Sequence, residues 1–290
     1  MNLRYPIAAG MFYEGTPASC RHHAAKLIES AKLPADLPSP LYGGLAPHAG
    51  WAYSGKTAAL THKAVMAGGP VRTLVMLSAH VMPSVRAAQV YDSGVWRTPL
   101  GDVAVDAELA AALLKAGKCL EAAPSAHDGD HSLEVHLPLL QVLSADVKIV
   151  PIAVPPTPLA IEVGQVLGQV LTGQFPAVRV IGSTDLTHHA GHFPAPGGRG
   201  EAGAKWAEQN DRRMIDLAES LAGEKVVAEW EKHQNACGAG AVAAAITAVK
   251  ALGAKRGLCL GYTNSYRIIH EQFPEETDDT TVGYAAVVFG

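Results

Sequence analysis

The sequence predicts a single α/β domain, a three-layer α/β/α sandwich with a mostly parallel central sheet. Three apolar runs, residues 73–77, 147–154 and 178–183, are almost unbroken, as expected for strands buried on both faces of a sheet. Segments of helical composition separate these runs, which is typical of crossovers between parallel strands. The 290 residues contain no internal repeat and no linker long enough to divide them, so we predict one domain over residues 1–290.

Composition and charge narrow the class of protein. Apolar residues make up 48% and charged residues 17% of the chain, and the net charge is −4 with opposite charges interspersed. This balance gives no sign of a nucleic-acid partner. No signal-peptide core and no apolar run of the roughly 20 residues that span a bilayer are present, so we expect a soluble, cytoplasmic protein without a membrane partner. The four widely spaced cysteines form no CxxC pair, which argues against a zinc ribbon or a disulfide framework.

The first third of the chain leads into the sheet. An extended arm is expected over residues 4–13 and a helix over 16–32, followed by a Pro-rich link and the opening strand at 41–46. Apolar bulk predicts a helix over 54–66, which Gly68-Gly69-Pro70 ends.

The middle of the chain predicts a strand pair or hairpin over 85–98, turning at residues 92–94. A helix over 106–115 follows, because Asp106 is a good N-cap before an Ala/Leu-rich run. Residues 126–141 are predicted to be partly helical, with Pro138 kinking one helix or opening a second.

The last third alternates again between helix and strand. The expected helices are a crossover over 159–171, two segments at 201–221 and 225–233, and an Ala-rich helix that opens at 235–240 and runs to 251. Residues 258–266 and 282–289 are expected to close the sheet.

Histidines or acidic residues follow three of the predicted strands. His48 lies between Pro47 and Gly50, just after the opening strand, and His80 follows the strand at 73–77. Ligands of open α/β sheets bind beyond the carboxyl ends of the strands, where these side chains would lie. For His48 alone, a turn in which the imidazole only bonds a carbonyl is the simpler interpretation. The recurrence at His80, and at Asp185 and His188 after a third strand, favours a functional site.

Cys237 is placed at the start of the Ala-rich helix. A thiol there feels the positive end of the helix dipole, which predicts a lowered pKa and a thiolate. Two imidazoles and a thiolate form a plausible ligand set for a redox-active transition metal with open coordination positions. The alternative is that Cys237 is a small buried core residue.

Several motifs together resemble the Memo-like family, which includes the AmmeMemoRadiSam system protein B. They occur in the family's order and cover nearly the whole chain. The motifs are Ala9-Gly10-Met11-Phe12-Tyr13, Pro47-His48-Ala49-Gly50-Trp51-Ala52-Tyr53-Ser54-Gly55, His131-Ser132-Leu133-Glu134 with Leu137-Pro138, Asp185-Leu186-Thr187-His188, Cys237-Gly238 and Val282-Gly283-Tyr284.

The resemblance implies a fold similar to that of class III ring-cleaving dioxygenases and a pocket that binds one iron or copper ion. By position in the motifs, His48, His80 and Cys237 would be the metal ligands. Asp185 and His188 would line the pocket and orient a ligand or move a proton. Radical SAM and AMMECR-type proteins are the partners that the family implies, beside an unidentified small-molecule or peptide ligand.

Three functions remain open from the sequence. The first is metal-dependent redox chemistry of the Memo type. The second is ring-opening by a non-haem iron dioxygenase, with His131 or His188 as the acid/base and Glu134 as a candidate carboxylate. A cysteine in place of a carboxylate among the metal ligands argues against this second function. The third is a non-catalytic protein that recognises a peptide or partner with a relic pocket.

His131 and Glu134 are predicted to contact the substrate, and their three-residue spacing would place them on one face if this segment is helical. Glu134 has the alternative of capping a helix or pairing with an arginine near the core. The other histidines are assigned to the surface or to positions behind the ligands: His22, His23, His62, His127, His136, His189, His192, His233 and His270.

Overall fold

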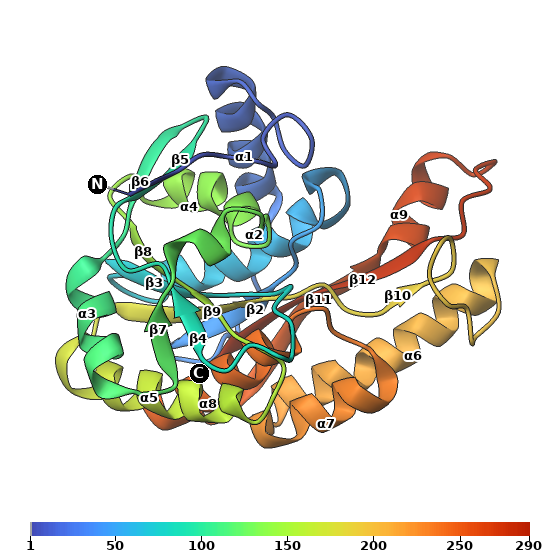
Figure 1. Cartoon of the computed structure of the whole chain (residues 1–290). Coiled ribbons are helices and arrows are strands. Elements are labelled where there is room, and N and C mark those ends of the chain that lie inside the picture. Colours follow the sequence, from blue (N-terminus) through green and yellow to red (C-terminus); the bar gives the residue numbers. More distant parts are fainter. Residues whose placement is uncertain (1) are drawn as a thin grey trace.

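A computed structural model describes residues 2–290 and contains a large mixed sheet with helices on both faces (Figure 1). Its centre is formed by adjacent parallel strands in the order β2-β9-β3-β8. Their bounds are Gly43–Ala46 for β2, Val178–Ser183 for β9, Thr73–Ser78 for β3 and Lys148–Ala153 for β8. The predicted α/β sandwich is thereby confirmed, with parallel pairing at the centre of the sheet.

The flanks of the sheet are largely antiparallel. On one side β12 pairs antiparallel with β2, with β11 and with the short β10. On the other side β4 pairs antiparallel with β8 and parallel with β7. These strands are β12 (Thr281–Phe289), β11 (Gly257–Asn264), β10 (His188–His189), β4 (Ala88–Val90) and β7 (Leu120–Ala122).

Helices cover both faces of the sheet and bury a separate apolar core on each (Figure 1). One layer consists of α1 (Pro17–Ser30), α2 (Trp51–Ala67) and α4 (Leu137–Leu143). The other consists of α3 (Ala107–Ala116), α5 (Leu159–Gln174), α7 (Gly223–His233) and α8 (Ala239–Leu252). α6 (Gly200–Glu219) and α9 (Ser265–Gln272) lie near the β10 end of the sheet.

The predicted hairpin over 85–98 is wrong. β4 joins the large sheet, whereas β5 (Val95–Thr98) forms a small separate sheet with β1 (Leu3–Arg4) and β6 (Gly101–Ala104). Gly94, at φ +107°, redirects the chain so that β5 pairs in parallel with the N-terminal arm. Such long-range pairing leaves no local sequence signal.

Residues 124–143 follow the prediction of a partly helical segment. They contain two 3₁₀ turns, Pro124–His127 and Glu134–His136, and Pro138 lies in the first turn of α4, so it opens a second helix as one of the two alternatives predicted. The strand expected over 258–266 ends at Asn264, because the Asn264 side chain accepts a hydrogen bond from the backbone N–H of Arg267 and caps α9. No helix in residues 2–290 is long and apolar enough to cross a bilayer.

Candidate metal centre

The side chains that follow the central strands meet at one edge of the sheet. His48 follows β2, Asp185 follows β9 and His80 follows β3. Because β9 lies between β2 and β3, Asp185 starts between the two histidines. Parallel strands bring their carboxyl ends to the same edge, so this convergence follows directly from the topology.

His48, His80 and Cys237 form the centre of the site. Each offers one ligand atom, and these atoms all lie within 4.8 Å of one another. The His48 and His80 ring centroids are 5.0 Å apart, and the Sγ atom of Cys237 lies 3.2 Å from Nε2 of His48. The two predicted histidines therefore face each other, and three separate parts of the chain supply donors that could hold one metal ion.

Cys237 lies just before α8, whose N-cap is Gly238. Its backbone N–H donates to the Asp185 carbonyl over 3.0 Å, and its Sγ accepts the Asp185 backbone N–H over 3.2 Å. Burial raises the pKa of the thiol strongly, and the nearby Asp185 carboxylate adds to the effect. The predicted lowering of the Cys237 pKa is thus wrong, because burial disfavours the charged thiolate.

The two histidines are held by different partners. His80 Nδ1 lies 3.3 Å from a carboxylate oxygen of Asp130, and that hydrogen bond raises the pKa of His80. His48 Nδ1 instead lies 2.8 Å from the hydroxyl of Ser183. Burial, followed by the neighbouring His80 and His131 rings, holds the pKa of His48 well below its usual range.

Asp185 and His188 have distinct places near this centre. A carboxylate oxygen of Asp185 accepts the backbone N–H of His48 over 2.7 Å, and burial raises the pKa of the carboxyl group. His188 donates from Nδ1 to the Leu186 carbonyl over 3.0 Å, which leaves Nε2 as an acceptor in the neutral ring. Burial lowers the pKa of His188, which favours the neutral ring and leaves the Nε2 lone pair free.

His131 and Glu134 point to different surroundings. The His131 ring lies 5.1 Å from that of His80 and 4.5 Å from that of Phe12, so it borders the site. Glu134 is fully buried and faces the N-terminal arm, where it pairs with Arg4 over 2.7 Å. They do not share a helical face, because residues 132–133 form a turn between them. The structure therefore agrees with the alternative prediction, in which Glu134 pairs with an arginine near the core.

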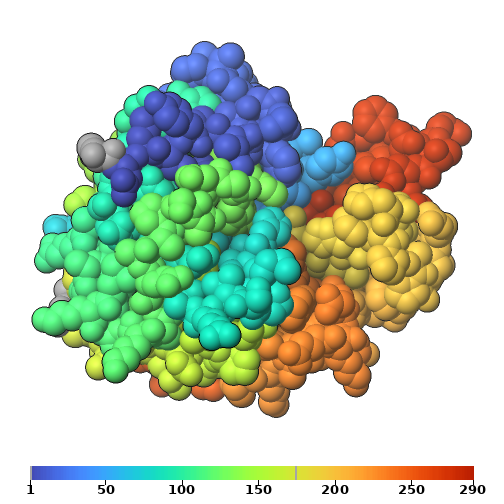
Figure 2. Space-filling view, in the orientation of Figure 1, coloured from blue at the N-terminus to red at the C-terminus, as the bar shows by residue number. Residues whose placement is uncertain are grey.

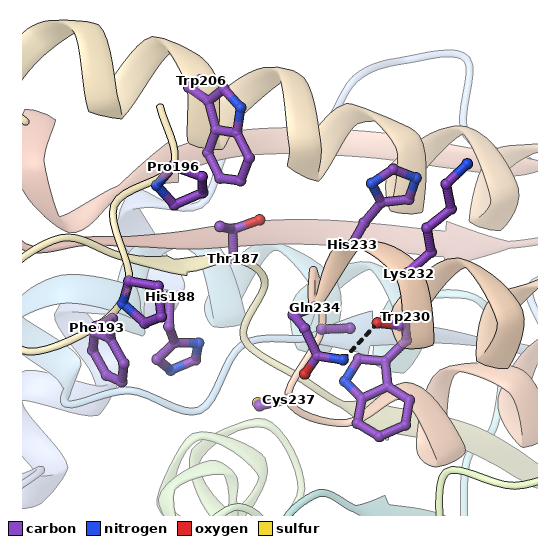
Figure 3. A pocket seen from close by; sticks show the side chains of 12 residues that line it. Thr187, His188, Phe193, Pro196, Trp206, Trp230, Lys232, His233, Gln234 and Cys237 are labelled. Carbon is purple, nitrogen blue, oxygen red and sulfur yellow. Dashed lines mark hydrogen bonds between the residues drawn. The ribbon is translucent and has the colours of Figure 1, made fainter. Parts of the chain in front are cut away.

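A pocket of about 600 Å³ opens beside Cys237 and His188 (Figure 3). Its walls include Phe193, Trp206 and Trp230. In the space-filling view, the teal surface near residue 85 borders the yellow and orange surfaces of residues 190–235 on the same face (Figure 2). Sequence reasoning missed the two tryptophans, because they lie on α6 and α7 and only the packing of these helices brings them together.

The fold and this donor set define a class of protein, an α/β sandwich with two histidines and a cysteine at the carboxyl edge of its sheet. The chain belongs to the Memo-like protein family, whose family model matches residues 4–288.

Two archaeal relatives match over almost the whole chain. A MEMO1 family protein of Methanopyrus kandleri is 33% identical and covers 99% of this chain and 98% of its own. A MEMO1 family protein of Nitrosopumilus maritimus is 31% identical and covers 99% of both. A crystal structure of an uncharacterized Escherichia coli protein aligns with a TM-score of 0.49 at 13% identity, over 79% of this chain and 90% of that one.

Proposed function

We propose that the chain is a metal-dependent oxidoreductase in which His48, His80 and Cys237 bind one iron or copper ion. The convergence of two imidazole nitrogens and one sulfur within 4.8 Å carries this proposal. Such a donor set suits copper or iron, whereas magnesium and calcium prefer oxygen ligands. A bound ion of this kind would supply one-electron chemistry.

The surrounding residues would position the substrate and move protons. The Asp185 carboxylate holds the backbone of His48 in place. His188 presents Nε2 as a proton acceptor beside the pocket, whose Phe193 and Trp230 walls would exclude water from an apolar substrate.

Elemental analysis of untagged protein purified without oxygen tests the metal site. We expect about one iron or copper ion per chain, and loss of that ion in His48→Ala, His80→Ala and Cys237→Ala. Cys259→Ala is the matched control, because Cys259 is also a free, partly buried cysteine but is not in this donor group. A wild-type protein without either metal, or equal metal loss in the control, would overturn the proposal.

A second candidate is ring-opening of an aromatic substrate, which the aromatic walls of the pocket favour. Oxygen uptake measured with catechols, and separately with ascorbate as a simple reductant, distinguishes the two activities. Oxygen uptake with catechols that yields ring-opened products would show that the protein is a dioxygenase and would overturn the first proposal. Full metal occupancy without any oxygen uptake would support a binding role instead.

A further inference from the structure

A chain of buried polar side chains runs from α2 to His48, behind the candidate metal centre. Nε2 of His62 lies 3.0 Å from Nδ1 of His136, and Nε2 of His136 lies 3.0 Å from Oγ of Ser183. The same Oγ lies 2.8 Å from Nδ1 of His48 and 2.7 Å from the carbonyl oxygen of Ser132. His62, His136, Ser183 and His48 are each at most 1% exposed.

The direction of each hydrogen bond follows from counting donors. A hydroxyl has one proton, and the Ser132 carbonyl can only accept, so Ser183 donates to Ser132. This carbonyl has no other hydrogen-bond donor within residues 2–290, and leaving it unpaired would cost about 1–3 kcal/mol. Ser183 must therefore accept from both imidazoles, which requires N–H at Nδ1 of His48 and at Nε2 of His136.

The same count of donors extends to His136 and His62, at the far end of this series of hydrogen bonds. Burial lowers the pKa of His62 to about 3 and the pKa of His136 well below its usual range, so both rings are neutral. A neutral His136 with N–H at Nε2 accepts at Nδ1, and His62 donates to it from Nε2. Nδ1 of His62 then needs no proton, which agrees with the absence of a partner for this atom among the described residues.

We infer that Ser183 is a positioning residue that fixes His48 in the Nδ1–H tautomer, and that His136 and His62 set the direction of the hydrogen bonds at Ser183. The consequence is that Nε2 of His48 always presents its lone pair toward Cys237 and His80. An imidazole in the other tautomer would aim an N–H at the place where an ion binds. The inference rests on the proposed function only in assigning this lone pair to a metal.

The metal-free protein with ¹⁵N-labelled histidine tests the inference directly. Long-range ¹H–¹⁵N spectra distinguish protonated from unprotonated ring nitrogens, and single-histidine variants assign the signals. We expect the proton at Nδ1 in His48 and at Nε2 in His136 and His62. A proton at Nε2 of His48, or the opposite tautomer of His136, would overturn the inference whether or not metal binds.

Ser183→Ala tests the consequence. Without the hydroxyl we expect His48 to lose its Nδ1–H preference and affinity for Fe(II) or Cu(I) to fall about 10–100-fold, as for other groups that orient a metal-bound histidine. Ser78→Ala is the matched control, because Ser78 is a buried serine at the end of the neighbouring strand whose hydroxyl has no partner in the described chain. It should change neither the tautomer nor the affinity.

The outcomes separate the two proposals. If Ser183→Ala keeps the Nδ1–H tautomer and full affinity, the inference is wrong while the metal site stands. If wild-type protein binds neither ion but shows the expected tautomers, the proposed function is wrong and the inference about His48 stands. If Ser78→Ala lowers affinity as much as Ser183→Ala, the loss reflects general disturbance of the strand ends, and the positioning role is refuted.

Discussion

Replacing Glu134 by glutamine should destabilise the whole protein, because this carboxylate anchors the N-terminal arm to the core. Its two oxygens accept hydrogen bonds from Arg4, from the backbone N–H groups of Ile7 and Ala8, and from the Tyr13 hydroxyl, over 2.7–2.9 Å. Both members of the ion pair are at most 2% exposed. Removing one partner of a buried pair costs about 3–5 kcal/mol, because the other charge remains buried without compensation.

Urea denaturation of Glu134→Gln measures this loss, and two further variants sharpen the result. Adding Arg4→Met removes the stranded charge, so the double variant should regain about 0.5–3 kcal/mol relative to the sum of the single losses. Asp102→Asn, which breaks the exposed pair with Arg97, should cost at most about 1 kcal/mol. If Glu134→Gln leaves the unfolding free energy unchanged but weakens ligand binding, the anchoring role is refuted. Glu134 would then be a substrate-binding residue, as the sequence predicts.

Further variants test the site and its support. Cys237→Ser should sharply lower iron or copper binding while the protein still folds, and full metal occupancy with a lowered melting temperature would remove this sulfur from the site. Asp185→Ala and His188→Ala should keep most of the metal by elemental analysis but lower oxygen uptake with a reductant, whereas complete metal loss in Asp185→Ala would make the aspartate a ligand. His80→Gly should leave the unfolding free energy unchanged or raise it by up to about 1 kcal/mol, because His80 has a φ of +58° that disfavours a side chain. Metal affinity should fall in the same variant, and a large loss of stability would contradict this prediction. Burial raises the pKa of Asp211 from 3.8 to about 7, so between these values the folded state holds a proton that the unfolded state has lost. The free energy of unfolding should therefore fall as pH rises from about 4 to 7, by roughly 4 kcal/mol at 1.36 kcal/mol per pKa unit. Asp211→Asn should flatten this dependence in denaturation curves, and an unchanged pH profile would show that the carboxyl group titrates normally.

Sequence reasoning located the parts of the site that the strand order determines. His48, His80 and Asp185 each follow an apolar run, and neighbouring parallel strands must bring such residues to one edge. Cys237 was found because glycines and an Ala-rich run mark a helix start, but the direction of its pKa shift depends on burial, which no local pattern reports.

The supporting residues could not be found in the same way. His62 lies within a helix whose Ala, Thr and Lys neighbours give little indication of which face is buried, yet the ring is fully buried. His136 meets it only after residues 131–138 fold as a turn followed by a proline-initiated helix. Contacts between residues 74 positions apart depend on the packing of α2 against this segment, so neither composition nor spacing could predict them.

The two halves of the candidate metal centre differ in a way that argues for function rather than stability. His48 is buried, and a neutral hydroxyl holds it within the core. The His80 side chain is 40% exposed and has a left-handed backbone that costs roughly 1–2 kcal/mol in a residue with a Cβ. Its hydrogen bond to Asp130 is long, at 3.3 Å, and is too weak to offset that cost fully. A strained residue that gains little from the fold indicates a functional requirement. Its ring lies opposite His48 and Cys237, so this strain supports the proposal that His80 is the third metal donor.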